Sequence, residues 1–338
     1  MSDMDRRTFL RRSAIAAGAV GAAALFGEHV LQQRRTVGAW DRAAFAPPGP
    51  ARVAAIAATS YDRGLEDLVG QGLGAIGADV TGARVVLKPN LVEFDAGTTI
   101  NTDPRLIAAT VVALRRMGAI DVAVGEGPGH RRDTQYVVAR SGLLDALDAV
   151  DTPFVDLNTD EVTRVPLHSR YTDLGSLWLP RSITDADVVI SMPKMKTHHW
   201  AGLTLSLKNC FGCVPGRIYG WPKNALHWAG LEQSILDIAG AVRPDYAIVD
   251  GIVGMEGNGP ISGTPIAANV LVFGDDPVAT DTVAAHLMGF DPEKVPYLAE
   301  AARFLGQGDM DRIRMEGEPM TRLTQDFAVL PPFRSMKG

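Results

Sequence analysis

The chain has 338 residues, of which 46% are hydrophobic and 21% are charged. This composition is ordinary for a globular protein and excludes a disordered or fibrous chain. The first 46 residues hold seven Lys or Arg and four Asp or Glu, so residues 47–338 keep 26 basic and 35 acidic residues. With no basic stripe in that acidic remainder, nucleic acid is excluded as a partner.

The N-terminal segment carries Arg6 and Arg7, followed by Phe9, Leu10 and an Ala/Gly-rich run over residues 14–26. It resembles a twin-arginine (Tat) signal. An uncleaved membrane anchor is the alternative, although a run of about 13 residues is short for a bilayer span. We therefore expect residues 1–46 to be a signal peptide and linker. Residues 47–338 would form a single α/β domain, exported through the Tat translocase to the periplasm.

From residue 52 onward, short β-rich apolar runs alternate with helical patterns, which is typical of an α/β fold with a mainly parallel sheet and helices on both faces. Asp103-Pro104 and Asp276-Pro277 each predict a helix start, since Asp caps a helix and Pro fits its first turn. Residues 153–181 hold three short strand-like pieces and predict a small antiparallel insertion or sheet edge. The expected strands cover residues 53–58, 84–87, 120–124, 187–191, 246–249 and 269–273.

Five of these expected strands are followed directly by a polar or glycine-rich motif, at residues 88–90, 125–134, 192–199, 250–260 and 274–277. The carboxyl ends of parallel strands share one edge of a sheet, and ligands bind there. Loops also use glycine, proline and Asp for ordinary turns. The recurrence of lysine, histidine and glutamate after these strands nevertheless predicts one shared cleft.

Two histidines and a lysine are the candidate catalytic residues. His130 lies just ahead of a helix start at Asp133, and His198 follows a strand, where an imidazole could move protons near neutral pH. We expect one of His198 and His199 to face inward and the other away. Lys208 lies in an apolar stretch and could act as a nucleophile or a cofactor attachment point. Structural histidines and a lysine at the edge of the core are the alternatives.

Anion binding is expected from four polar side chains and a glycine-rich loop. Lys88, Asn90, Lys194 and Lys196 follow predicted strands and would neutralise an anionic substrate or cofactor. The loop at residues 250–260 holds four glycines, whose backbone N–H groups could form an anion nest that includes Gly257 and Asn258. Glu256 in the same loop is a possible metal or proton-transfer carboxylate.

Cys210 and Cys213 are the only cysteines in the chain. A zinc or iron–sulfur site needs four ligands, so an iron–sulfur cluster held by this chain alone is not expected. A disulfide after export is possible. Burial as two small hydrophobic side chains is the favoured interpretation.

A family resemblance rests on short motifs that lie between residues 52 and 305. They include Lys88-Pro89-Asn90, Gly125-Glu126-Gly127-Pro128, Lys208-Asn209 and Asp276-Pro277 with Asp281, together with residues 101–104, 193–198 and 255–260. In combination these motifs resemble the family catalogued as domain of unknown function 362. The family name implies no reaction.

A more distant resemblance is to the catalytic domain of nickel-pincer lactate racemases. It rests on the order Gly129-His130-Arg131, His198, Ala201-Gly202, Lys208, Pro215-Gly216 and His227, with ten residues from His198 to Lys208. The resemblance implies that His130 and His198 form an acid/base pair, that Lys208 anchors a cofactor and that His227 binds a metal.

These observations favour an exported enzyme of unknown substrate that performs proton transfer or redox chemistry on a small anion, with a metal or an organic cofactor. A periplasmic module that binds a small anion or a partner protein without catalysis is the alternative. Neither the substrate nor the oligomeric state follows from the sequence.

Overall fold

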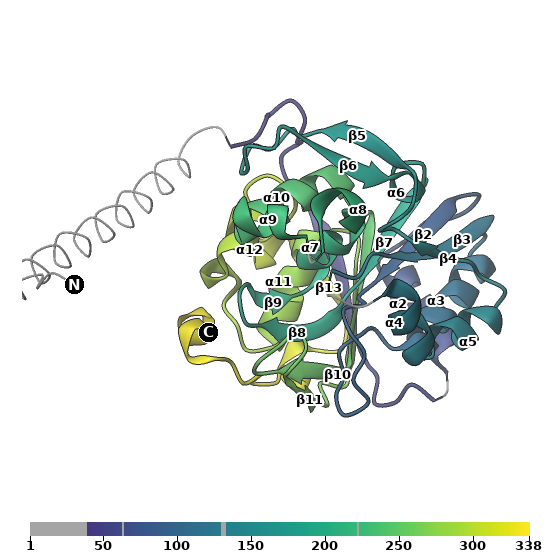
Figure 1. Cartoon of the computed structure of the whole chain (residues 1–338). Coiled ribbons are helices and arrows are strands. Elements are labelled where there is room, and N and C mark those ends of the chain that lie inside the picture. The colour runs from purple at the N-terminus through teal and green to yellow at the C-terminus, as the bar shows by residue number, and fades with distance from the viewer. Residues whose placement is uncertain (1–38, 63, 130–132, 222) are drawn as a thin grey trace, which may run out of the picture.

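The structure is a computed structural model that describes residues 39–62, 64–129, 133–221 and 223–338. Its centre is an 11-stranded mixed sheet in which eight strands follow the order β13-β1-β12-β10-β7-β2-β3-β4, while β8, β9 and β11 extend it beyond β10 (Figure 1). The strands are β1 (Ala51–Ala57), β2 (Arg84–Pro89), β3 (Asp121–Glu126), β4 (Phe154–Asp156), β5 (Val162–Pro166), β6 (Ser176–Pro180), β7 (Val188–Met192), β8 (Lys194–His198), β9 (Gly202–Thr204), β10 (Tyr246–Glu256), β11 (Thr264–Ile266), β12 (Val270–Gly274) and β13 (Ile313–Gly317).

Strand directions decide which loops can share a site. Each neighbouring pair along β10, β7, β2, β3 and β4 is parallel, so the carboxyl ends of these strands meet at one edge. Strand β12 runs antiparallel to both β10 and β1. The expectation that the motif after β12 joins the common edge is therefore wrong. Residues 274–277 lie at the opposite edge, where Asp275 pairs with Arg52 at the start of β1.

Two predicted helix starts are confirmed by their caps. The Asp103 carboxylate accepts the backbone N–H of Arg105 ahead of α3, and the Asp276 carboxylate accepts those of Val278 and Ala279 ahead of α11. In both helices a proline occupies the first turn, where its missing N–H costs nothing. The α-helices are α2 (Leu65–Ala75), α3 (Pro104–Arg116), α4 (Thr134–Arg140), α5 (Leu143–Asp148), α6 (Arg181–Thr184), α7 (Ser206–Asn209), α8 (Gly216–Tyr219), α9 (Asn224–Trp228), α10 (Leu231–Val242), α11 (Pro277–Leu287), α12 (Pro296–Ala301) and α13 (Met320–Leu323).

Four short 3₁₀ helices complete the described elements. They are η1 (Cys210–Cys213), η2 (Pro292–Lys294), η3 (Met310–Arg312) and η4 (Pro331–Met336). No helix in the part of the chain that the structure describes is long and apolar enough to cross a bilayer.

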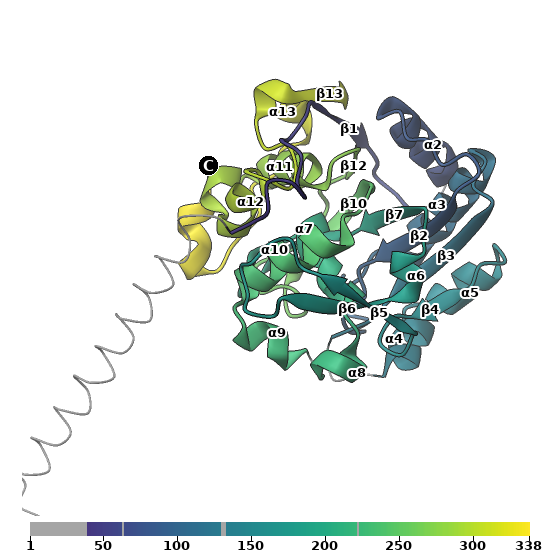
Figure 2. The same ribbon diagram turned by 90° about the horizontal axis from the view of Figure 1, so that it is seen from above.

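Helices cover both faces of the sheet, as the sequence predicts. Helices α2 to α5 lie on one side, and α7 and α9 to α12 lie on the other (Figure 2). Each side has its own apolar core: one is built around Leu73, Leu106 and Ile107, and the other around Ile235, Val283 and Tyr297. The sheet is buried on both faces, which explains why its strands are continuous apolar runs.

The segment from residue 153 to 181 is part sheet edge and part insertion. Strand β4 adds to the main sheet parallel to β3. Strands β5 and β6 pair antiparallel in a separate two-stranded sheet, so the small antiparallel insertion is confirmed.

Strand β10 is longer than expected. It continues through Glu256, and its distal half pairs with β8 and with β11. Residues 250–256, interpreted from the sequence as a glycine-rich loop, are therefore strand. A side chain at Gly251 would meet Met195 and Val270, and one at Gly254 would meet Met195 and Phe327. These two glycines allow close packing between strands.

Candidate functional site

A cavity of about 560 Å³ lies where the carboxyl ends of β2 and β3 meet β8 and the segment from α7 to α9. Its size is in the range of small-molecule sites. Its polar and aromatic lining comes from Lys88, Asn90, Glu126, Lys196, His198, His199, Trp200, Thr204, Lys208, Asn209, Phe211, Lys223 and His227.

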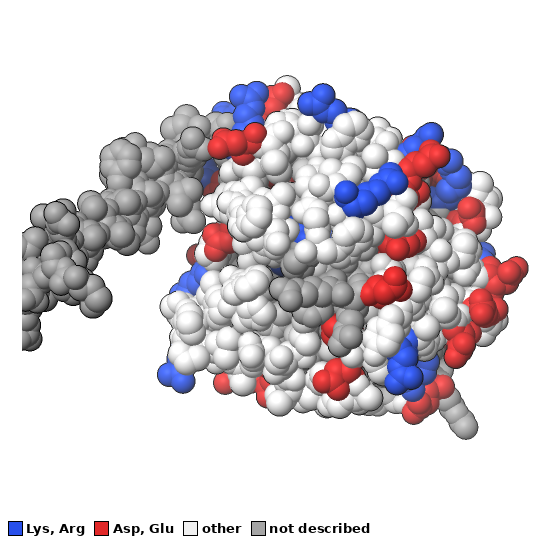
Figure 3. Space-filling view, viewed as in Figure 1, with Lys and Arg blue, Asp and Glu red and all other residues white. Residues whose placement is uncertain are grey.

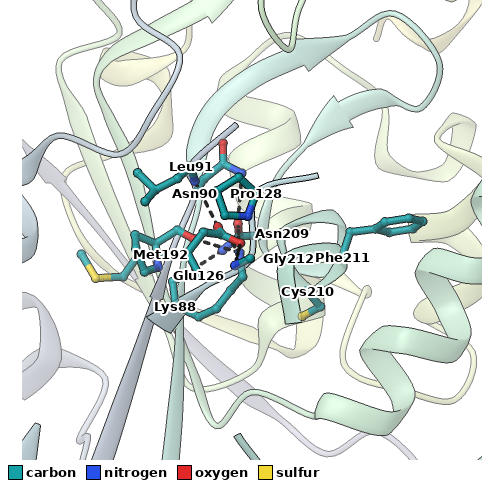
Figure 4. Close-up of polar contacts among 12 residues, drawn as sticks. Lys88, Asn90, Leu91, Glu126, Pro128, Met192, Asn209, Cys210, Phe211 and Gly212 are labelled. Atoms are coloured by element: carbon teal, nitrogen blue, oxygen red, sulfur yellow. Dashed lines mark hydrogen bonds and ion pairs between the residues drawn. The ribbon is translucent and has the colours of Figure 1, made fainter. Parts of the chain in front are cut away.

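A buried ion pair holds one wall of the cavity together. Lys88 Nζ donates to Glu126 Oε2 at 2.6 Å, to Asn209 Oδ1 at 2.8 Å and to the Pro89 carbonyl at 2.9 Å (Figure 4). The Glu126 carboxylate also accepts the backbone N–H groups of Leu91 and Gly127. All three Lys88 donors are thus used inside the protein, and the pair fixes β2, β3 and α7 relative to one another.

Close packing explains why position 212, in the Cys-Phe-Gly-Cys segment, is a glycine. A Cβ at this position would overlap Glu126 Oε1 and crowd Lys88 Nζ. Glycine at position 212 therefore lets the 3₁₀ helix η1 pass over the buried ion pair without displacing it.

Helix α7 is short, and Asp281 of α11 caps it. The two carboxylate oxygens of Asp281 accept the backbone N–H groups of Ser206 at 2.7 Å and Leu207 at 2.9 Å. Burial raises the pKa of Asp281 to about 7. This contact fixes the helix that carries Lys208 and Asn209.

Lys208 differs from the other lysines of the cavity. Its Nζ lies 4.2 Å from the centroid of the Phe211 ring and makes no hydrogen bond or ion pair with any described residue. Burial, and next the positive charge of Lys88, lower the pKa of Lys208 to about 8. A substantial fraction of Lys208 is therefore neutral amine at mildly alkaline pH.

Two further lysines face backbone carbonyls. Lys196 Nζ donates to Ile100 O at 2.8 Å and to Pro260 O at 3.4 Å, and burial holds its pKa well below the ordinary value. Lys223 Nζ donates to the carbonyls of Gly127, Phe211 and Gly212. Burial lowers the pKa of Lys223 to about 7, yet only the ammonium form supplies three N–H donors for three carbonyls.

The tautomer of His198 follows from its backbone contacts. His198 Nδ1 accepts the N–H groups of Trp200 at 3.0 Å and Ala201 at 3.2 Å, so a neutral ring carries its proton on Nε2. Burial holds the His198 pKa well below its usual value. The geometry therefore favours His198 as a hydrogen-bond donor rather than a proton acceptor.

His227 has the opposite tautomer. Its Nδ1 lies 3.0 Å from the Lys223 carbonyl oxygen, which can only accept, so Nδ1 carries the proton and Nε2 keeps a lone pair. Burial also lowers the His227 pKa. The cavity thus holds one imidazole suited to donate through Nε2 and one suited to accept a proton there.

Aromatic side chains form the outer part of the cavity. Trp200, 63% exposed, packs edge-on against His199 and His227, and Phe211 lies beside His227. On the face of the molecule that Figure 3 shows, the middle is mostly uncharged, and most charged side chains lie nearer the rim. Asn90 Oδ1 and Thr204 Oγ1 are buried without a hydrogen-bond partner among the described residues.

Most of the residues singled out from the sequence meet in this cavity. Both His198 and His199 line it, so the expectation that one of them faces away is wrong, because His199 lies in the turn after β8. His130 lies outside the described residues. The other sequence candidates that line the cavity are Lys88, Asn90, Lys196, Lys208 and His227.

Four sequence candidates lie elsewhere. Lys194 Nζ contacts Asp250 at 2.6 Å and the Tyr61 hydroxyl at 3.1 Å in a separate buried cluster. Gly257 N–H donates to the Ala328 carbonyl, and Asn258 is exposed. The Glu256 carboxylate accepts the Ala328 N–H. Gly257 is therefore not free to form the expected anion nest.

The described residues do not fit a metal site made by protein ligands. His227 lines the cavity but Glu256, the other expected ligand, does not. No three His, Cys, Asp or Glu side chains within the described ranges come together as they would around a metal ion. Cys210 and Cys213 are buried free thiols, as favoured from the sequence, and burial raises the pKa of both.

Sequence reasoning missed several cavity residues. Glu126 and Asn209 stand inside two of the family motifs but were given no role, although they could have been found as polar side chains at a strand end and beside Lys208. The sequence carries no pattern that would mark Lys223, because this residue lies in an irregular connection between α8 and α9, where its backbone is left-handed.

Comparison with known proteins places the chain in a family. A model described as "Domain of unknown function (DUF362)" matches residues 85–286. A thylakoid-associated protein of Synechocystis sp. is 34% identical over 242 residues, which cover 68% of this chain and 71% of that protein.

Two solved structures share a distant likeness. The lactate racemase apoprotein from Thermoanaerobacterium thermosaccharolyticum aligns with 13% identity and a TM-score of 0.46, over 71% of this chain and 57% of that one. A protein from Thermotoga maritima aligns with 15% identity and a TM-score of 0.39, over 66% and 58%. This chain spans less than two thirds of either structure, and such TM-scores carry no argument about activity. The family match and the 34% identical relative show that the chain belongs to the DUF362 family.

Proposed function

We propose that the protein is an enzyme that binds a small organic anion in the cavity and transfers a proton to or from it. The supporting observation is that two imidazoles with opposite tautomers, His198 and His227, line the same cavity as Lys208, whose Nζ makes no hydrogen bond with a described residue.

The charges of the cavity favour an anion. Its described lining holds four lysines and a single carboxylate, Glu126, which Lys88 already neutralises. Mutual repulsion contributes to the low pKa values of Lys196 and Lys208. An anionic ligand would relieve this repulsion. Its apolar part would pack on Trp200 and Phe211.

Proton transfer is the chemistry that the side chains supply. His227 Nε2 would accept a proton from the ligand, and His198 Nε2–H would donate a hydrogen bond to the oxygen on which charge develops. Both cysteines lie outside the cavity lining, so a thiol-based redox reaction has no support from the described residues.

The test is hydrogen exchange on candidate ligands. A panel of two- to six-carbon carboxylates is incubated with the protein in D₂O, and loss of C–H signals is followed by NMR. We expect exchange at one carbon of a bound carboxylate, reduced by about 10²-fold or more in His227→Gln, which removes a general base. Binding without exchange for every carboxylate bound would contradict the proposal.

A binding module without catalysis is the second candidate, favoured by the surplus of lysines. It needs the cationic lining but not His227. If His227→Gln keeps the affinity of the wild type and no ligand exchanges its protons, this candidate replaces the enzyme.

We also propose that the protein is exported by the Tat translocase, a transient partner. The support is the pair Arg6-Arg7 ahead of the Ala/Gly-rich run. Replacing both arginines by lysine should retain the protein in the cytoplasm, as measured by cell fractionation. Export that needs neither arginine would contradict this.

A further inference from the structure

We propose that Lys208 forms an imine with a carbonyl group of the bound anion, which makes 2-oxo acids and other carbonyl-bearing carboxylates the substrate class of this site. This inference rests on the proposed function and names the substrate class for it.

Hydrogen bonding separates Lys208 from the other lysines of the cavity. Lys88 and Lys223 each donate to three acceptors, and Lys196 donates to two carbonyls. Attack on a carbonyl needs an amine with a free lone pair. Lys208 is the described cavity lysine that can lose a proton without giving up a hydrogen bond.

The surroundings of Lys208 favour the neutral amine. It faces the charges of Lys88 from β2, Lys196 from β8 and Lys223 ahead of α9, together with the imidazoles of His198 and His227. Glu126 from β3 is the opposing negative charge, and Lys88 binds it at 2.6 Å. Desolvation next to another cation is a recognised way to activate an amine nucleophile.

The step balances without an external oxidant or reductant. The lone pair of Lys208 Nζ attacks the carbonyl carbon, the carbonyl π electrons move to oxygen, and a proton passes from Nζ to that oxygen. The resulting carbinolamine takes up one proton from solvent and loses the oxygen as water, while the lone pair of Nζ forms the C=N bond. One neutral amine, one carbonyl and one proton thus give one protonated imine and one water.

With an imine at Lys208, each of the two histidines has a role in the reaction. A protonated imine withdraws electrons from the neighbouring carbon, so a C–H proton there becomes acidic enough for His227 Nε2 to take. His198 Nε2–H would donate a hydrogen bond to the carbonyl oxygen before it leaves. The carboxylate of the same ligand would meet Lys196, which uses only two of its three N–H donors on described residues.

Reductive trapping tests the proposal on the wild-type protein, with no variant needed. Glyoxylate or pyruvate is added with sodium cyanoborohydride, which delivers hydride to the imine carbon and fixes the adduct as a secondary amine. Peptide mapping by mass spectrometry then locates it. At pH 8 about half of Lys208 is amine, against less than about 1% of an ordinary lysine. We expect Lys208 to be labelled more than tenfold faster than exposed Lys294.

Three controls sharpen the test. Propionate, an anion without an aldehyde or ketone carbonyl, should suppress labelling of Lys208 and leave Lys294 unchanged. Acetone, a carbonyl without charge, should label Lys208 poorly. Lys208→Met should lose the preferred adduct, while Lys294→Met keeps it.

The outcomes separate this inference from the proposed function. Adducts spread over exposed lysines with no preference for Lys208 would overturn the imine. If deuterium exchange persists in that case, the enzyme stands and Lys208 is only an anion-binding cation. If exchange and propionate protection are both absent, the proposed function fails as well.

Discussion

At pH 7 the ammonium group of Lys208 lowers the stability of the fold, because burial lowers its pKa to about 8 in the folded protein. Below pH 8 the folded and unfolded chains both carry the charge, and the folded chain bears the full desolvation cost. Between pH 8 and about 10.4 the folded state releases its proton first, so stability rises with pH.

Lys208→Met should therefore stabilise the protein by on the order of 2 to 3 kcal/mol at pH 7 and by much less near pH 10. Urea denaturation at both pH values measures this. Lys294→Met, at an exposed site, should change stability by less than about 0.5 kcal/mol at pH 7. If the free energies of unfolding of wild type and Lys208→Met differ by the same amount at both pH values, the charge of Lys208 is not the cause of the difference.

Gly212→Ala should destabilise the protein by about 1 to 3 kcal/mol, because the added methyl group overlaps Glu126 Oε1 and the buried ion pair must shift to make room. The matched control is Gly70→Ala in helix α2, where nothing lies within 4 Å of the new Cβ. That change should be neutral or stabilising by up to about 1 kcal/mol. Urea denaturation of both variants is the measurement, and a tolerated Gly212→Ala would contradict the packing argument.

At the scale of elements, helix α7 depends on a contact from another helix, α11. Asp281→Asn replaces one carboxylate oxygen by an NH₂ group, which then faces a backbone N–H, so we expect a loss of about 1 to 3 kcal/mol. Because α7 carries Lys208, the pH midpoint of Lys208 trapping should also move toward that of an ordinary lysine.

Asp309→Asn is a control for this change, because Asp309 also accepts a backbone N–H but caps η3 at an exposed site. It should leave the trapping profile unchanged. If Asp281→Asn lowers stability but leaves the pH midpoint at its wild-type value, then Asp281 does not position Lys208.

The sequence predicted elements well where the signal is local. Asp-Pro pairs place the starts of α3 and α11 because capping needs only neighbouring residues. The direction of β12 was not predictable in this way, because its apolar run at residues 270–274 looks the same parallel or antiparallel. The length of β10 was missed because its glycines serve partners distant in sequence, such as Met195 and Phe327.

At the scale of the molecule, the sequence could predict the site residues that lie at the carboxyl ends of parallel strands, because these ends share one edge of the sheet. Lys88 and His198 meet because β2 and β8 belong to parallel pairs that end at one edge, and Lys208 joins them from α7. Lys194 was misassigned because its partner Asp250 is 56 residues away, and no sequence pattern shows that the two charges neutralise each other.

Ligand binding should stabilise the whole fold. An anion that occupies the cavity at 100 times its Kd adds about 2.7 kcal/mol to the free energy of unfolding. Thermal denaturation with pyruvate should therefore show a higher Tm than with an equal concentration of sodium chloride. Equal Tm values up to millimolar pyruvate would show that this anion does not bind.

Strand β13 lies beside β1, with Ala51 opposite Ile313, although the two strands are separated by most of the chain. During synthesis, β1 cannot gain this neighbour until residues 313–317 have left the ribosome. Until then one side of β1 offers unpaired backbone groups to other chains, a known route to aggregation. The sheet is thus completed late in synthesis, and a chain released before residue 313 would keep an unpaired, aggregation-prone edge at β1.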